Sequence, residues 1–230
     1  MARRTARFAP PDLPPAGGVI TSITRSPAAP DVFLIKIGKR AAGRIHESTA
    51  ASLRIAEDAP WTDRLREAIA SAMLEESARE WAIHAVARRA MSRAMLINKL
   101  RQRFLPPALA ARIAEDLVAR GILNEKSFAE GLVETTISRK AAGKRLLVTR
   151  LRSKGIHQRL ATDSVEKVTT ESGYDAREAA LDLARRKLRS MGRLNPEQRQ
   201  RRLYGLLARR GFDSDLCREI VDRLVRHPED

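Results

Sequence analysis

The sequence is poor in cysteine and in aromatic residues. One of its 230 residues is cysteine, Cys217, so no disulfide can form within the chain, and only 4% are aromatic. So few rings argue against a sheet-type binder that stacks single-stranded bases. Charged residues interrupt every apolar run before the ~20 residues that a membrane-spanning helix needs. We therefore expect a cytoplasmic protein that spans no membrane and is stabilised by packing alone.

Signatures of enzymatic chemistry are also missing. The four histidines stand at no metal-ligand spacing from one another, from the cysteine or from paired acids. The sequence has no G-x-x-x-x-G-K-[ST] loop and no G-x-G-x-x-G after a strand, which are the common cradles for nucleotide phosphates. Cys217 is set in an apolar helical pattern with no histidine partner, as expected for a structural thiol. These absences predict a protein without enzymatic activity, metal or cofactor.

Positive charge is what the sequence has in excess. Its 44 Lys and Arg residues outnumber 28 Asp and Glu, for a net charge of +16. The excess is spread out, since residues 82–124, 125–173 and 174–230 carry +6, +4 and +4. Charge distributed in this way predicts an extended acidic partner, such as DNA, an acidic protein groove or both together.

The apolar pattern divides the chain into two parts. Between Val19 and Ile45 the apolar runs are short, and Gly38 is placed for a hairpin turn, which predicts a small sheet of two or three strands. Ser48 is expected to cap a short helix that ends at Ile55. After Pro60 the apolar period becomes 3.6, which predicts helices to the end of the chain.

The helical part repeats itself. Residues 147–156 match residues 96–105 after a shift of 51 positions, and residues 203–212 after a shift of 56. The predicted fold class is therefore mainly α: three tandem three-helix repeats that form an elongated, curved body, preceded by a small β-hairpin and helix. The expected parts are a flexible, basic, Pro-rich tail (1–18), a β-hairpin with a short helix (19–60), a connecting helix (61–78) and repeats at 79–124, 125–173 and 174–230.

Three motifs in the repeats point to a known family. They are Gly121-Ile-Leu-Asn-Glu-Lys-Ser-Phe-Ala129, Gly143-Lys-Arg-Leu-Leu-Val-Thr-Arg-Leu-Arg-Ser-Lys-Gly-Ile156 and Arg202-Leu-Tyr-Gly-Leu-Leu-Ala-Arg-Arg-Gly-Phe-Asp213. In order and spacing they resemble the RecX family, regulators of the bacterial recombinase RecA. The resemblance covers residues 80–226. The first repeat departs most, because Phe104 stands where the other repeats have glycine and Ser92-Arg-Ala-Met-Leu96 replaces the family's Ser-Arg-x-Glu-Leu.

The resemblance implies a non-enzymatic regulator. Members of this family lie in the groove of the RecA–DNA filament, where they restrain ATP hydrolysis, strand exchange and filament growth in DNA repair, homologous recombination and the SOS response. The implied partner is the RecA filament, with DNA bound weakly or as part of the filament, and the implied state is a monomer. The alternative is a transcriptional regulator that binds DNA directly. Its recognition helix would read the bases through Asn98 and Arg101 or through Arg145 and Arg152.

Basic residues on the second helix of each repeat are the candidate contacts. Arg103, Lys154 and Arg210 share one position in the three repeats, in a last helical turn where the dipole alone favours a cation by about 0.3–1 kcal/mol. Arg145 and Arg152 lie opposite the apolar face of their helix, so they face either solvent or a partner. The candidate partner- or DNA-binding residues are Arg101, Arg103, Arg145, Arg152, Lys154, Arg209 and Arg210.

Overall fold

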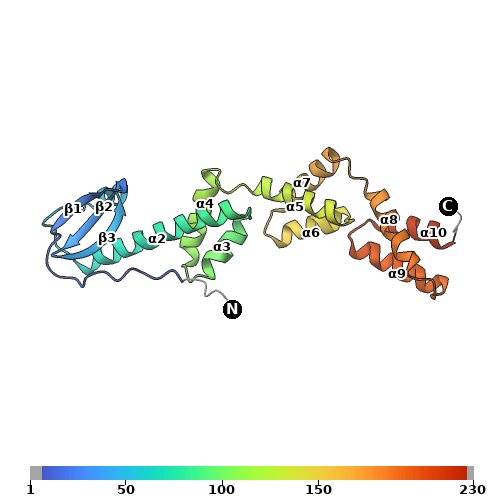
Figure 1. The fold of residues 1–230 in the computed structure, drawn as a ribbon, viewed down its shortest axis with the longest axis horizontal. Coiled ribbons are helices and arrows are strands. Elements are labelled where there is room, and N and C mark those ends of the chain that lie inside the picture. Colours follow the sequence, from blue (N-terminus) through green and yellow to red (C-terminus); the bar gives the residue numbers. More distant parts are fainter. Residues whose placement is uncertain (1–6, 227–230) are drawn as a thin grey trace. The chain divides into compact units, whose positions relative to one another are not determined.

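The computed structural model describes residues 7–226 and divides into two compact units. The first unit contains residues up to 89 and residues 96–122, and the second contains residues 90–95 and 123 onward. A three-stranded sheet precedes a series of helices (Figure 1). The predicted mainly helical class with a small N-terminal sheet is confirmed.

The sheet is antiparallel with strand order β1-β2-β3. Its strands are β1 (Ser22–Ser26), β2 (Ala29–Ile37) and β3 (Arg40–His46). Gly38 has φ +58° in the turn between β2 and β3, as its position in the sequence predicted. Ile35 on β2 is almost fully buried and contributes to the core below the sheet.

The short helix after the sheet begins earlier than expected. Helix α1 spans Glu47–Ser52, and His46 rather than Ser48 is its N-cap, because the His46 ring nitrogen Nδ1 accepts the amide hydrogen of Ser48 at 3.3 Å. The helix ends before Ile55 because Arg54 adopts a left-handed conformation with φ +51°. The boundary Ser48–Ile55 is therefore corrected at both ends.

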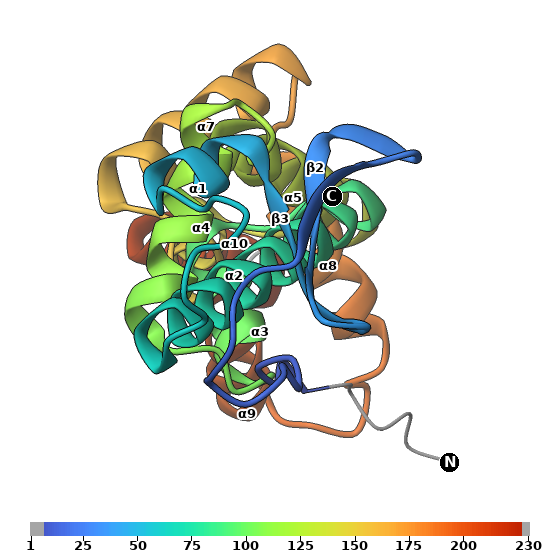
Figure 2. The ribbon, with the colours of Figure 1, turned by 90° about the vertical axis from the view of Figure 1, so that its left-hand side faces the viewer.

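One long helix joins the sheet to the first repeat. Helix α2 (Asp63–Arg88) contains neither Pro nor Gly, so the expected connecting helix (61–78) and the first helix of repeat 1 form a single continuous helix. It passes behind the sheet in Figure 2. A Cβ added to Gly43 of β3 would lie 2.8 Å from Ile69 Cγ2, so glycine permits this close approach.

The segment before the sheet is held along the first unit. The first six residues of the expected flexible tail lie outside the described residues, but Phe8 N donates to Arg103 O at 3.0 Å and Trp61 Nε1 donates to Pro14 O at 3.1 Å. Leu13 is buried. The segment runs beside α2 toward the end of α3 (Figure 1), fixed by backbone hydrogen bonds that the Pro-rich sequence does not reveal.

Eight further helices follow α2 in the described part of the chain. They are α3 (Arg93–Arg101), α4 (Pro107–Ala119), α5 (Glu125–Arg139), α6 (Lys144–Ser153), α7 (Gln158–Glu171), α8 (Ala176–Arg189), α9 (Pro196–Arg209) and α10 (Ser214–Arg226). Their cores repeat, because Leu100, Leu151 and Leu207 hold one aligned position and are each 0% exposed. The aligned apolar positions of the sequence are thus core positions.

The second and third helices of each repeat are joined by a left-handed turn. Gly155 and Gly211 have φ +83° and +77°, and Phe104 has φ +67°. The first repeat therefore keeps the backbone geometry of the other two, although it carries a bulky residue at a position where L-residues other than Gly are uncommon.

Candidate partner-binding surface

Positive charge is sorted by helix position within each repeat. The second helices α3, α6 and α9 carry three, four and four cations, and their one acidic residue is Glu197 at the start of α9. The third helices differ: α4 has one cation and two acids, α7 two and three, and α10 three of each. Among first helices only α8 is basic, with five cations and two acids. In repeats 1 and 2 the excess charge is therefore greatest on the second helix, and in repeat 3 it is shared equally by α8 and α9.

Helix α6 shows how this charge is presented. Leu147 and Leu151 are buried, whereas Arg145, Thr149 and Arg152 are exposed along one face at the i, i+4, i+7 spacing. Thr149 Oγ1 donates to Arg145 O at 2.7 Å, so the hydroxyl is turned back to its own helix. Neither arginine on this face forms an ion pair with any described residue. This face thus presents two available guanidinium groups.

The backbone carbonyl groups of the aligned residues Arg103, Lys154 and Arg210 have the same role. In each repeat the carbonyl oxygen at this position accepts a hydrogen bond from a segment earlier in the chain. The donor to Arg103 O is Phe8 N at 3.0 Å, and the donor to Arg210 O is Gly143 N at 2.8 Å. Lys154 O accepts from the hydroxyl of Ser92. The repeated position is therefore a joint at which another segment is seated.

The three aligned side chains have different surroundings. The Arg103 guanidinium lies 4.3 Å from the centre of the Trp81 ring, a cation–π distance. Lys154 is exposed, while Arg210 is half-buried and its Nη1 donates to Ala141 O at 3.3 Å. Arg101 and Arg209 are exposed at the ends of α3 and α9. Contact of these residues with a partner remains a prediction, and their environments show that they are not equivalent.

A hollow of about 430 Å³ opens at the start of α6, within the second unit. Its lining includes Arg145, Thr149 and Gln158, together with Asp213 from the segment before α10. Of the seven predicted contact residues, Arg145 is the one that lines this hollow. The lining is mainly apolar, with Arg145 among its few charged groups. The guanidinium can bind an anionic group there.

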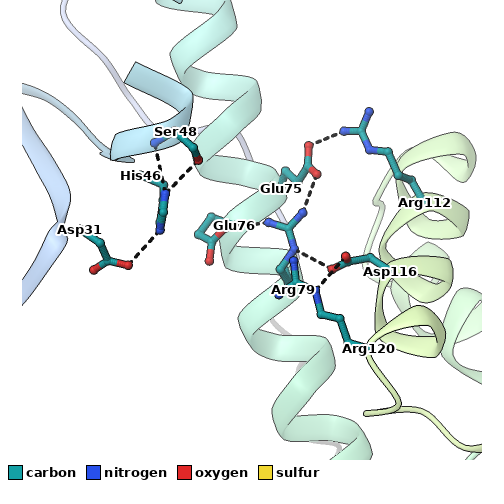
Figure 3. A network of polar contacts seen from close by, with 9 residues as sticks. All are labelled: Asp31, His46, Ser48, Glu75, Glu76, Arg79, Arg112, Asp116 and Arg120. Carbon is teal, nitrogen blue, oxygen red and sulfur yellow. Dashed lines mark hydrogen bonds and ion pairs between the residues drawn. The ribbon is translucent and has the colours of Figure 1, made fainter. Parts of the chain in front are cut away.

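A separate polar network joins α2 to α4 in the first unit (Figure 3). Arg79 is its centre, with Nη2 2.8 Å from Glu75, Nη1 2.7 Å from Glu76 and Nε 3.4 Å from Asp116. Burial lowers the pKa of Arg79, but the surrounding carboxylates outweigh burial and the pKa is raised. Arg112 pairs with Glu75 as well. Because its charges are mutually paired, the network serves to hold the two helices together.

The remaining groups of the described residues form neither a metal site nor a reactive thiol. Within residues 7–226 no cluster of three or more His, Cys, Asp or Glu could hold a metal ion. Burial, helped by Asp213, raises the pKa of the Cys217 thiol, while Arg145 lowers it, and the net direction is upward. A raised pKa keeps this thiol protonated and weakly nucleophilic. No helix in the described part is long and apolar enough to span a membrane.

Sequence reasoning missed the joints between segments. Ala94 lies so close to Gly155 that an added Cβ would be 2.2 Å from the Ala94 Cβ, and a Cβ on Gly211 would lie 2.2 Å from Leu146 N. The glycine at each turn is the sequence signal that could have revealed the joint. Glycine at these turns also permits close approach by a preceding second helix.

Comparison with known proteins gives consistent similarities. Residues 175–221 match the model for the third three-helix domain of RecX. The chain is 31% identical over 152 residues to regulatory protein RecX of Chlorobium phaeobacteroides, covering 66% of this chain and 96% of the relative. It is 32% identical over 171 residues to regulatory protein RecX of Mycolicibacterium vanbaalenii, covering 70% of this chain and 90% of the relative.

Solved structures support the same fold. A crystal structure of regulatory protein RecX superposes with a TM-score of 0.73 at 20% identity, covering 89% of this chain and 98% of that chain. The structure of RecX from Lactobacillus salivarius gives a TM-score of 0.56 at 21% identity, covering 65% of this chain and 96% of that chain. At these identities the structural likeness concerns the fold.

Proposed function

Because the chain belongs to the RecX family of regulatory proteins, we propose that it restrains the RecA recombinase by binding in the groove of the RecA–DNA filament. It acts there by binding, without enzymatic chemistry or a cofactor, and it limits ATP hydrolysis, strand exchange and filament growth. Its place is the bacterial cytoplasm, in DNA repair by homologous recombination and in the SOS response. It works as a monomer.

The observation that carries this proposal is the repeated basic helix. Each repeat contributes one second helix with three or four cations, and these helices recur with the period of the repeats. A filament presents the same acidic surface again and again, so a chain with a cationic element in each repeat can contact successive copies of that surface. Charge complementarity of this kind favours fast and selective association.

The decisive experiment measures ATP hydrolysis by the host recombinase on single-stranded DNA. The protein is titrated from far below to equal stoichiometry at two salt concentrations, with and without additional DNA. We expect inhibition at low ratios that persists when DNA is added. No inhibition, or inhibition that added DNA abolishes, would contradict binding to the filament and favour the recognition-helix alternative, whose DNA affinity should fall steeply with salt.

A charge-reversal variant tests the basic face directly. Arg145→Glu with Arg152→Glu should raise the concentration for half-maximal inhibition about tenfold or more, since two attractive contacts become repulsive. The matched control is Arg159→Glu with Arg218→Glu, which removes the same charge from exposed positions on third helices. Both variants should retain the wild-type melting temperature. Unchanged inhibition by the first variant would show that this face makes no contact.

A further inference from the structure

Phe104 is the most exposed large apolar side chain among the described residues, at 62%. It has φ +67°, a conformation in which bulky residues are rare and which marks binding sites when it is retained. The equivalent turns use Gly155 and Gly211, so the backbone of this turn does not need a side chain.

The ring is not retained for packing. On the side where a Cβ would stand, the glycine turns lie against preceding segments, as Gly155 lies against Ala94, whereas the Phe104 side chain is 62% exposed. Its one ring contact within the described residues is with Arg7, whose guanidinium carbon lies 4.2 Å from the ring centre. An arginine on one face and 62% exposure leave ring surface available to a ligand.

The two chain segments that meet beside the ring are basic. Residues 7–11 and 93–114 contain no Asp or Glu. These two segments meet at the Phe8 N to Arg103 O hydrogen bond, and the Phe8 ring lies 5.9 Å from the Trp81 ring, edge to face. Arg7, and also Arg101 in the last turn of α3, form no ion pair with a described residue. The site combines an open aromatic face with available positive charge.

We propose that this site, formed by Phe104, Arg7 and Arg101, binds an unpaired nucleobase and its neighbouring phosphates in a single-stranded nucleic acid. The base stacks on the open face of Phe104, and the guanidinium groups pair with the phosphates, which is the combination that single-strand binders use. The positive charge of these two segments favours the phosphates of a nucleic acid over an uncharged apolar partner. This site goes beyond the proposed function, because it acts on nucleic acid without the recombinase.

The test measures binding of the full chain to fluorescent oligonucleotides by anisotropy at fixed salt. The probes are oligo-dT, oligo-rU of the same length, a DNA duplex, and an abasic strand that keeps the phosphates but lacks bases. Phe104→Gly should weaken oligo-dT binding about tenfold, Phe104→Leu should weaken it similarly, and Phe104→Tyr should restore it. Ile122→Ala, at another exposed apolar position in the same unit, is the control and should not change binding.

The abasic strand separates stacking from charge. It should bind more weakly than oligo-dT, and no Phe104 variant should change its affinity. Arg7→Ala should weaken the binding of both strands. Tighter binding of dT or of rU assigns the natural source as DNA or RNA. Because glycine is already used in the equivalent turns, Phe104→Gly should melt as the wild type does, which keeps the result interpretable.

Two outcomes would overturn the site. One is oligo-dT binding that Phe104→Gly leaves unchanged, including the case in which this variant loses recombinase inhibition, since the ring would then contact a protein. The other is a loss of affinity on Phe104→Gly that is as large for the abasic strand as for oligo-dT. A wild-type protein that binds oligo-dT through Phe104 but fails to inhibit the recombinase would contradict the proposed function and leave this site standing.

Discussion

The left-handed turns of the three repeats have one backbone geometry and two kinds of surroundings. In the second unit a neighbouring segment approaches Gly155 and Gly211 so closely that an added Cβ would lie 2.2 Å from one of its atoms. In the first unit Phe104 occupies the same conformation with its ring 62% exposed. The residue type therefore follows what lies on the turn, and the conformation follows the helix pair that the turn joins.

The carbonyl before each turn extends this comparison. In repeat 2 it accepts a hydrogen bond from Ser92 Oγ, just before α3, and in repeat 3 from Gly143 N, just before α6. In repeat 1 the donor is Phe8 N. The first repeat has no repeat before it, and the N-terminal segment takes that place. Terminal units of repeat proteins need such a cap, because one of their faces has no neighbouring unit.

The strongest way to break the comparison is to fill a covered turn. Gly211→Val should lower the free energy of unfolding by about 4 kcal/mol, from left-handed strain and from overpacking against Leu146. The control is Gly173→Val, at φ +64° with nothing within 4 Å of its added Cβ, which should cost about 1–2 kcal/mol. Denaturant unfolding measures both, and equal losses would show that Gly211 is not a packed joint.

The shared core gives the next largest effect. Leu151→Ala should cost roughly 2–5 kcal/mol, because the side chain is fully buried in the core of repeat 2. Leu100→Ala and Leu207→Ala should cost similar amounts, since both are also 0% exposed. A loss below about 1 kcal/mol in thermal or denaturant unfolding would mean that the helix faces are assigned incorrectly.

The aligned cations give the smallest effect and sharpen the contrast between first and later repeats. Arg103→Ala should cost about 1 kcal/mol, because it removes the cation from the Trp81 ring. Lys154→Ala should cost at most about 0.3 kcal/mol, since the side chain is exposed at a helix end. Paired unfolding curves measure the difference, and equal values would make the two positions equivalent after all.

Sequence periodicity located the repeating cores because helical packing is a local, periodic property. The helix starts at Asn124 and Asp175 follow an equally local rule, since each side chain accepts an amide hydrogen of its own first turn. The cap at His46 was not, because a histidine ring is an uncommon capping group. The charge excess was readable as a total, but its distribution among the helices required the helix boundaries.

By itself the sequence determined the mainly helical class, the three-fold repetition, the buried leucines and the basic character, because composition and period act through neighbours a few residues apart. Only the tertiary structure decided that Gly155 and Gly211 are seats for other segments, that residues 7–18 are fixed to the first unit, and that Phe104 stays open. These contacts join residues that are separated by 62, 67 and up to about a hundred positions in the sequence, as Ser92 is from Lys154 and Phe8 from Arg103. No local pattern encodes which distant segment will pack against a given turn.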